Sequence, residues 1–180
     1  MARKMALAAV GRDCPGIVSA VSRVLYQHGC NLEDSSMTIL RGEFAMILIV
    51  AVPQESSLDA LRSDLERAAD HLQLVLSFRE LPDTQREPTE PGGLPYILSV
   101  YGADHPGIVA RVTELLANNN INITDVNTRV VGGKDPVYIM LLEVEVPERL
   151  SPDVLSDMLS RLAQELRVEI TFRPLETANL

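Results

Sequence analysis

The amino-acid sequence repeats itself, and this repeat constrains the fold more than any other feature. The segment Gly11–Val18 (GRDCPGIV) recurs as Gly102–Val109 (GADHPGIV), with six of eight residues identical at an offset of 91 positions. The correspondence continues to the end of both copies, with one insertion of three residues around Gly132, after which the offset is 94. A repeat that holds its register over this length indicates two structural units built to one plan.

Within each copy, the apolar pattern changes in a fixed order. A short apolar run predicts a strand (Met5–Val10 and Ile97–Tyr101), and Pro-Gly followed by a helical stripe then predicts a helix. The first stripe contains Ile17, Val21, Val24 and Leu25, and the second contains Ile108, Val112, Leu115 and Leu116. Pro15 and Pro106 suit the first helical turn, where a missing N–H has no cost.

Two strands, a second helix and a closing strand complete each copy. The strands are predicted at Asn31–Leu40, Glu43–Val52, Asn122–Val131 and Pro136–Val146, with hairpin turns at Gly42 and at Gly132-Gly133. The order β-α-β-β-α-β is that of the ferredoxin-like fold. We therefore expect an α+β chain of two tandem βαββαβ domains, each a four-stranded antiparallel sheet with two helices on one face.

A segment rich in proline and polar residues separates the two copies. Such a composition favours a semi-extended linker. We predict a first domain over residues 1–80, a linker over residues 81–95 and a second domain over residues 96–180.

Composition excludes several classes of function. The net charge is −9 and no cluster of Lys and Arg is present, which argues against a nucleic-acid surface on this chain. No apolar run approaches the roughly 20 residues that a bilayer requires, so we expect a cytoplasmic protein without a membrane partner. Cys14 and Cys30 flank a predicted helix of about 20 Å, beyond the reach of a disulfide, so both are expected to be free thiols.

The motif Gly-x-Asp-x-Pro-Gly-Ile-Val, followed by a helix and then by Asn and an apolar residue, resembles the ACT domain. The resemblance covers nearly the whole chain twice. It implies a ligand-sensing module that commonly binds amino acids between paired domains. The stretch Cys30–Phe44 and the tandem layout are similar to the glycine cleavage system transcriptional repressor family, which acts through a partner activator protein. The amino-terminal ACT domain of formyltetrahydrofolate deformylase has a similar first-repeat pattern, but that enzyme's catalytic domain has no counterpart here.

Three features of each copy suggest a site for an amino acid. The turns Gly11–Gly16 and Gly102–Gly107 open a helix N-terminus whose free N–H groups suit a carboxylate. An acid precedes Pro-Gly and could meet an ammonium group, and an Asn begins the next strand, where its amide could meet both charged groups. The candidate ligand-binding residues are Asp13, Cys14, Gly16, Asn31, Asp104, His105, Gly107 and Asn122.

Structural explanations of the same residues remain open. Pro-Gly could simply enforce a tight bend, the aspartates could cap the helices, and the asparagines could hold a helix-to-strand corner. A nucleophilic Cys14–His105 pair, or a zinc site made by these two residues with Asp13 and Asp104, is conceivable, but no third orienting group is evident. We therefore expect no enzyme activity, no metal and no cofactor.

The hypothesis that unites these features is a non-catalytic regulator. It would sense an amino acid, with glycine or serine as first candidates from the family resemblance, and act through contact with a protein such as a transcriptional activator. It could regulate glycine cleavage genes in this way, and a homo-oligomer is possible. The alternatives are a ligand-independent dimerisation or interaction module, and an enzyme that uses the Cys14/His105 region.

Overall fold

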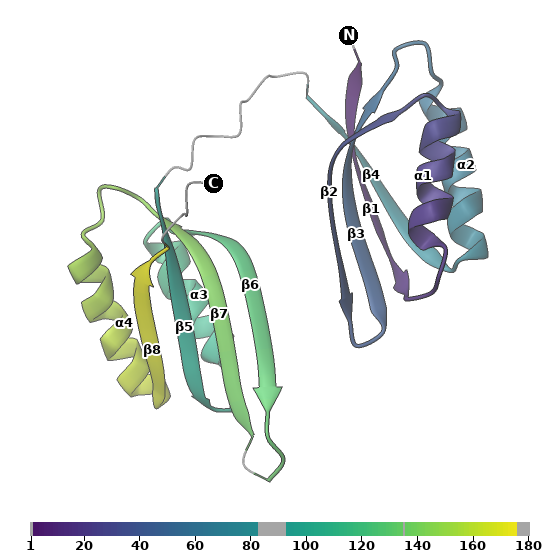
Figure 1. The fold of residues 1–180 in the computed structure, drawn as a ribbon. Helices are drawn as coiled ribbons and strands as arrows, with labels where there is room; N and C mark the ends of the chain where they lie inside the picture. The colour runs from purple at the N-terminus through teal and green to yellow at the C-terminus, as the bar shows by residue number, and fades with distance from the viewer. Residues whose placement is uncertain (1, 83–92, 135, 176–180) are drawn as a thin grey trace. The chain divides into compact units, whose positions relative to one another are not determined.

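The computed structural model describes residues 2–82, 93–134 and 136–175. The chain divides into two compact units, Met1–Gln85 (unit 1) and Arg86–Leu180 (unit 2). Each unit has its own hydrophobic core. Figure 1 shows that each unit is a single sheet with both of its helices on one face.

Unit 1 has the order β-α-β-β-α-β. Its elements are β1 (Arg3–Arg12), α1 (Ile17–Gln27), β2 (Asn31–Leu40), β3 (Glu43–Val52), α2 (Leu58–His71) and β4 (Leu74–Leu81). The sheet is antiparallel, with the strand order β2-β3-β1-β4.

Unit 2 repeats this order. Its elements are β5 (Leu94–Ala103), α3 (Ile108–Asn118), β6 (Asn122–Val131), β7 (Val137–Val146), α4 (Pro152–Leu166) and β8 (Val168–Pro174). The strand order β6-β7-β5-β8 is the exact counterpart of the first sheet. The predicted fold class is therefore confirmed in both halves.

The cores explain why these segments form these elements. Alternate residues of β1 and β3 are buried, as are those of β5 and β7, because only one face of each central strand meets the helices. The helical stripes that begin at Ile17 and Ile108 point into the cores. Strand β2 is exposed along its whole length because it lies at the edge of the sheet. Within the described residues, no helix is long and apolar enough to cross a membrane.

Two details differ from the sequence-based expectations. Pro15 and Pro106 precede the helices instead of lying in the first turn, since α1 and α3 are capped by Gly16 and Gly107. In addition, Leu81 belongs to β4, and Leu94 and Pro95 belong to β5, so both ends of the predicted 81–95 linker lie in strands. Residues 83–92 of that linker lie outside the described residues.

Candidate functional site

The turn between the first strand and the first helix has the same open geometry in both units. Gly16 and Gly107 are the N-cap residues, and both have φ = 102°, a left-handed conformation that glycine adopts without strain. Among the residues that the structure describes, no side chain caps α1 or α3, and a Cβ atom placed on either glycine would meet nothing within 4 Å. The first N–H groups of both helices therefore remain available to an anion.

Other residues of the motif have structural roles. A Cβ atom on Gly11 would lie 2.8 Å from the backbone oxygen of Gln73, so glycine is required where this turn passes β4. The backbone N–H of Asp13 donates to the Gly42 oxygen (2.8 Å) and ties the turn to the β2–β3 hairpin. Cys14 packs against the core of unit 1. Much of the motif thus serves the bend itself, while the exposed Asp13 carboxylate caps no helix.

Unit 2 builds its turn in the same way. A Cβ atom on Gly102 would lie 2.7 Å from Cγ1 of Val168, and the N–H of Asp104 donates to the Pro136 oxygen (3.2 Å). Asp104 is exposed, like Asp13, and α3 has no side-chain cap.

The candidate asparagines lie at the opposite end of each sheet. Asn31 is aligned with Ala51, whereas the turn is reached beside Phe44, seven residues away along β3. At about 3.4 Å per residue, this separation is about 24 Å. In unit 2, Asn122 is aligned with Glu145, to which its amide donates (3.3 Å), again seven residues from the turn at Tyr138. Within one unit, the structure therefore does not bring the turn and the asparagine together.

His105 holds the end of a helix. Its Nε2 lies 2.8 Å from the backbone oxygen of Leu166, the last residue of α4, and its Nδ1 lies 3.1 Å from the oxygen of Pro106. Hydrogen bonds to the Pro106 and Leu166 carbonyls raise the pKa of the imidazole, because only the protonated ring can donate from both nitrogens. With both nitrogens directed at carbonyls, His105 has no nitrogen positioned to activate a thiol, so the Cys14/His105 enzyme hypothesis gains no support from this geometry.

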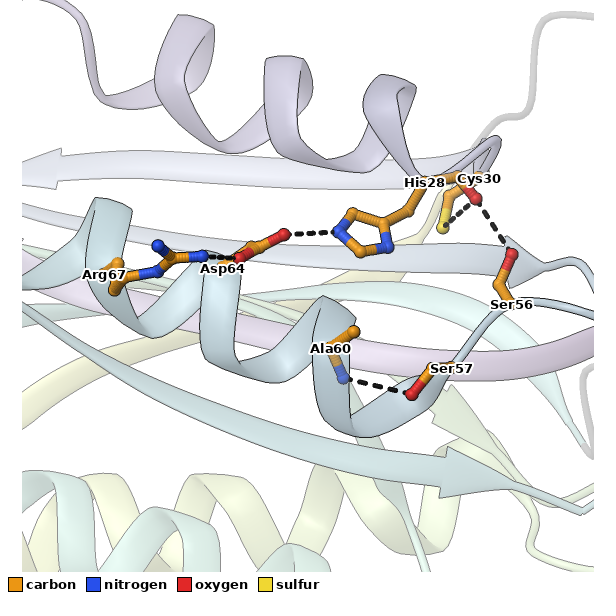
Figure 2. A network of polar contacts seen from close by, with 7 residues as sticks. All are labelled: His28, Cys30, Ser56, Ser57, Ala60, Asp64 and Arg67. Atoms are coloured by element: carbon orange, nitrogen blue, oxygen red, sulfur yellow. Dashed lines mark hydrogen bonds and ion pairs between the residues drawn. The ribbon is translucent and has the colours of Figure 1, made fainter.

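A polar network in unit 1 was not expected from the sequence. Figure 2 shows His28 at the end of α1 contacting Asp64 of α2 (Nε2 to Oδ2, 2.7 Å), and Asp64 also pairs with Arg67. Hydrogen bonds from His28 and then from Arg67 lower the pKa of the Asp64 carboxyl group. The i,i+3 spacing of Asp64 and Arg67 is visible in the sequence, but the contact with His28 depends on the packing of two helices.

This network does not form a catalytic triad. The Ser56 hydroxyl donates to the backbone oxygen of His28 (3.0 Å), so it is not paired with the imidazole ring. Burial raises the pKa of the nearby Cys30 thiol, which disfavours the nucleophilic thiolate. Among residues 2–82, 93–134 and 136–175, no group of three or more His, Cys, Asp or Glu side chains could hold a metal ion.

Comparison with known proteins agrees with the repeated fold. Residues 5–79 and residues 96–166 each match a model of the ACT domain. A UPF0237 protein of Methanopyrus kandleri is 42% identical over 64 residues, which cover 35% of this chain and 71% of that protein. The glycine cleavage system transcriptional repressor of Escherichia coli is 28% identical over 125 residues, which cover 69% of this chain but only 64% of the repressor.

A solved structure matches both units. The crystal structure of an unknown protein from Galdieria sulphuraria has a TM-score of 0.82 and 28% identity, and the match covers 98% of this chain and 100% of that chain. Together, the two family matches and the duplicated topology account for most of the described residues. The chain therefore belongs to the ACT-domain family as a tandem ACT-domain regulatory protein, and it is similar to glycine cleavage system transcriptional repressors.

Proposed function

We propose that this protein senses an amino acid and transmits the result by contact with a protein partner. The observation that carries the proposal is the pair of ACT-domain matches, one in each unit, in a chain whose relative in Escherichia coli is a transcriptional repressor. Glycine and serine are the first ligands to test. We place the protein in the cytoplasm, where a partner such as a transcriptional activator fits this role, and glycine cleavage genes are the natural first target.

The helix N-termini support a carboxylate site. Each unit offers an uncapped first turn after a glycine, with an exposed aspartate three residues before that glycine. We propose that the ligand carboxylate meets the N–H groups at Gly16 or Gly107, and that its ammonium group meets Asp13 or Asp104. Cys14 and His105 flank these groups from within the same turns.

The asparagines add a geometric condition to this proposal. Since Asn31 and Asn122 lie about 24 Å from the turns of their own units, one ligand can contact both kinds of group only if two modules contribute to it. A second copy of the chain could supply the second module.

Calorimetry with a panel of amino acids tests the proposal. Loss of one hydrogen bond to a charged group costs about 1.5–3 kcal/mol, so Asn31→Ala or Asn122→Ala should weaken binding roughly ten- to a hundredfold. Asn118→Ala changes an exposed asparagine of α3 and serves as the control. Binding that survives unchanged in the Asn31→Ala/Asn122→Ala double variant would exclude the asparagines from the site and would leave the turns at Gly16 and Gly107 as its only proposed contacts. An absence of binding to every amino acid would favour the ligand-independent interaction module.

A separate experiment tests whether the protein acts through a protein partner or binds DNA itself. With a net charge of −9, the chain should not bind duplex DNA alone at physiological salt. A gel shift with the purified protein checks this expectation. Tight, salt-sensitive binding would contradict the proposal that a protein partner makes the DNA contact.

A further inference from the structure

Helices α3 and α4 of unit 2 enclose an open groove of about 420 Å³. Helix α3 lines it from Arg111 to Asn119, and α4 lines it from Met158 to Glu165. Figure 1 shows that both helices lie on the same face of the second sheet. The groove is therefore bounded by two helices of one unit, and none of the residues proposed to contact the amino acid lines it.

The floor of the groove is apolar and follows the helices. Leu162 is buried, and Leu115 and Met158 are partly buried. On α3, the lining residues Arg111, Leu115 and Asn118 are four and three positions apart, so they share one side of the helix. On both helices the lining spans seven or eight positions, which is about 11 Å of helix. A groove of about two turns with an apolar floor suits an amphipathic helix.

The two sides of the groove carry opposite charges. Glu114 of α3 and Arg161 of α4 are both exposed and line it from opposite sides. Among the ion pairs of the described residues, only that of Arg111 and Glu165 connects the two helices of unit 2, with 2.9 Å between Nη2 and Oε2. Glu114 and Arg161 have no ion-pair partner among these residues, so both charges can meet those of a bound helix.

Unit 1 fills the corresponding space with a polar contact. His28 at the end of α1 lies 2.7 Å from Asp64 of α2. The offsets of 91 and 94 that relate the two copies place Asn119 and Met158 at these positions. Asn119 donates instead to the Leu115 oxygen (2.8 Å), and the thioether of a methionine carries no charge. These two residues of unit 2 therefore cannot form the bridge that crosses unit 1 at this point.

The charges beside that space differ as well. Arginine occupies both positions in unit 1, where Arg23 corresponds to Glu114 and Arg67 corresponds to Arg161. Two basic sides favour an acidic helix, whereas one acidic and one basic side favour a helix that carries both charges. Opposite charges beside the groove are thus a property of unit 2 and not of the repeated fold.

We propose that this groove binds an amphipathic helix of a protein partner. The partner helix has acidic residues along one side of its apolar stripe and basic residues along the other. Its apolar stripe packs on the floor of the groove. Its acidic side faces Arg161, and its basic side faces Glu114. This inference rests on the proposed function, because it assigns the contact with a protein partner to one surface.

Three synthetic peptides test the proposal on the full chain. Each is held helical by a side-chain staple, because short helices are marginal in water, and all three share one apolar stripe. The first has one acidic and one basic side, the second has two acidic sides, and the third has two basic sides. The readout is the ¹³C-methyl signal of Met158 in the groove, with the buried Met140 and Met5 as references.

We expect the first peptide to shift the Met158 signal saturably and to bind about three- to tenfold more tightly than the other two. The preference is modest because exposed ion pairs select between partners more than they add affinity. The signals of Met140 and Met5 should not shift. A lack of saturable Met158 shifts with all three peptides, or equal affinities for all three, would overturn the proposal.

Charge reversal at the two sides of the groove gives the variants. Glu114→Arg makes both sides basic, as in unit 1, and should move the preference to the peptide with two acidic sides. Arg161→Glu makes both sides acidic and should move the preference to the peptide with two basic sides. The double variant should again prefer the first peptide, which can bind in the reverse direction. Arg23→Glu, at the equivalent exposed residue of unit 1, is the matched control and should change none of the affinities.

An unchanged preference in both single variants would overturn the site. So would a Met158 shift that follows protein concentration without peptide, because a second copy would then occupy the groove. Calorimetry with glycine and serine on the wild type separates this inference from the proposed function. If an amino acid binds and no peptide does, only the groove proposal fails. If the peptides behave as expected and no amino acid binds, only the sensing role fails.

Discussion

The two units have nearly the same backbone but differ in the layer between helices and sheet. In both, the second strand meets the third with a register shift after its second residue, at Leu32/Asp34 and at Ile123/Asp125. Both first helices also begin after a left-handed glycine. Features that the chain path requires are thus shared, whereas the side chains that fill the interior have diverged.

Different polar contacts link the two helices of each unit. In unit 1, His28 connects α1 to Asp64 of α2. In unit 2, Arg111 of α3 pairs with Glu165 of α4 (2.9 Å), and Asn119, which corresponds to His28, donates to the Leu115 oxygen (2.8 Å). In unit 2, Tyr96 stacks on Phe172 with ring centroids 4.4 Å apart, while the equivalent Phe78 of unit 1 lies under the Arg62 guanidinium. The two units therefore differ in the polar link between their helices and in the partner of the equivalent phenylalanine.

The largest expected effect tests whether the two cores are separate. Leu61 and Leu155 are equivalent residues of α2 and α4, and both are 0% exposed. Leu61→Ala or Leu155→Ala should destabilise the unit that carries it by about 2–5 kcal/mol, because the removed methyl groups leave a cavity. Urea unfolding followed by NMR signals of each unit measures this effect.

The control for that pair is Val154→Ala, a change at a 47%-exposed residue of α4, which should cost less than about 0.5 kcal/mol. Equal destabilisation of both units by either leucine substitution would contradict the independence of the two cores.

A smaller loss of stability is expected at Gly11 and Gly102, where an added Cβ atom would meet a neighbouring atom. Gly11→Ala would push a Cβ atom to 2.8 Å from the backbone oxygen of Gln73, whereas in Gly102→Ala the nearest atom is a side-chain methyl of Val168 at 2.7 Å. Such overpacking costs about 1–3 kcal/mol, and we expect Gly11→Ala to be the costlier of the two because backbone moves less easily than a methyl group.

Thermal unfolding of both variants, with Gly133→Ala as the control, checks this order. A Cβ atom on Gly133 would meet nothing within 4 Å. A larger loss in Gly102→Ala than in Gly11→Ala would show that Val168 has no room to adjust.

Local sequence patterns predicted the elements well because each pattern reflects a local cause. The β2 and β3 bounds agree with prediction because Arg41 and Gly42, with φ of 53° and 87°, form a two-residue turn that sets where both strands end. The predicted stripes of α1 and α3 agree with the structure for the same reason, since all of their residues except the partly buried Leu115 lie in the two cores.

The candidate site was harder to predict, because its geometry depends on contacts between distant segments. The turn motif identifies Gly16 correctly as a special backbone position, but the separation of Asn31 from that turn follows only from the antiparallel register of β1, β3 and β2. Likewise, His105 occupies a ligand-like position in the sequence, yet its partner is the carbonyl oxygen of Leu166, 61 residues away. Long-range register and helix packing leave no local trace in the chain.

The polar link of unit 1 should make that unit sensitive to acid. The pKa of Asp64 is lowered in the folded state, so its contribution is present above the unfolded value of about 3.9 and is lost as the pH falls through the lower folded value. Asp64→Asn should reduce the acid sensitivity of unit 1 and leave unit 2, which has Met158 at this position, unchanged. Urea midpoints at about pH 5 and about pH 3 measure this dependence.

Because the Asp64 side chain is 32% exposed, the effect should be modest and should shrink in high salt. An acid response of unit 1 that is identical in wild type and Asp64→Asn would assign that response to other carboxylates.

The smallest expected effect has the opposite sign and belongs to unit 2. The pKa of His105 is raised by its carbonyl partners, so its stabilising contribution is complete below the unfolded value of about 6.5 and is lost as the pH rises through the higher folded value. His105→Cys places in unit 2 the residue that unit 1 has at Cys14. This variant should no longer lose stability in unit 2 as the pH rises. His71→Gln, at an exposed histidine of α2, is the control and should keep this loss. Urea midpoints of unit 2 at about pH 6 and about pH 8 measure the change. If His105→Cys retains the full pH dependence, the Leu166 carbonyl is not held by a protonated imidazole, and the two units differ at this turn in residue type alone.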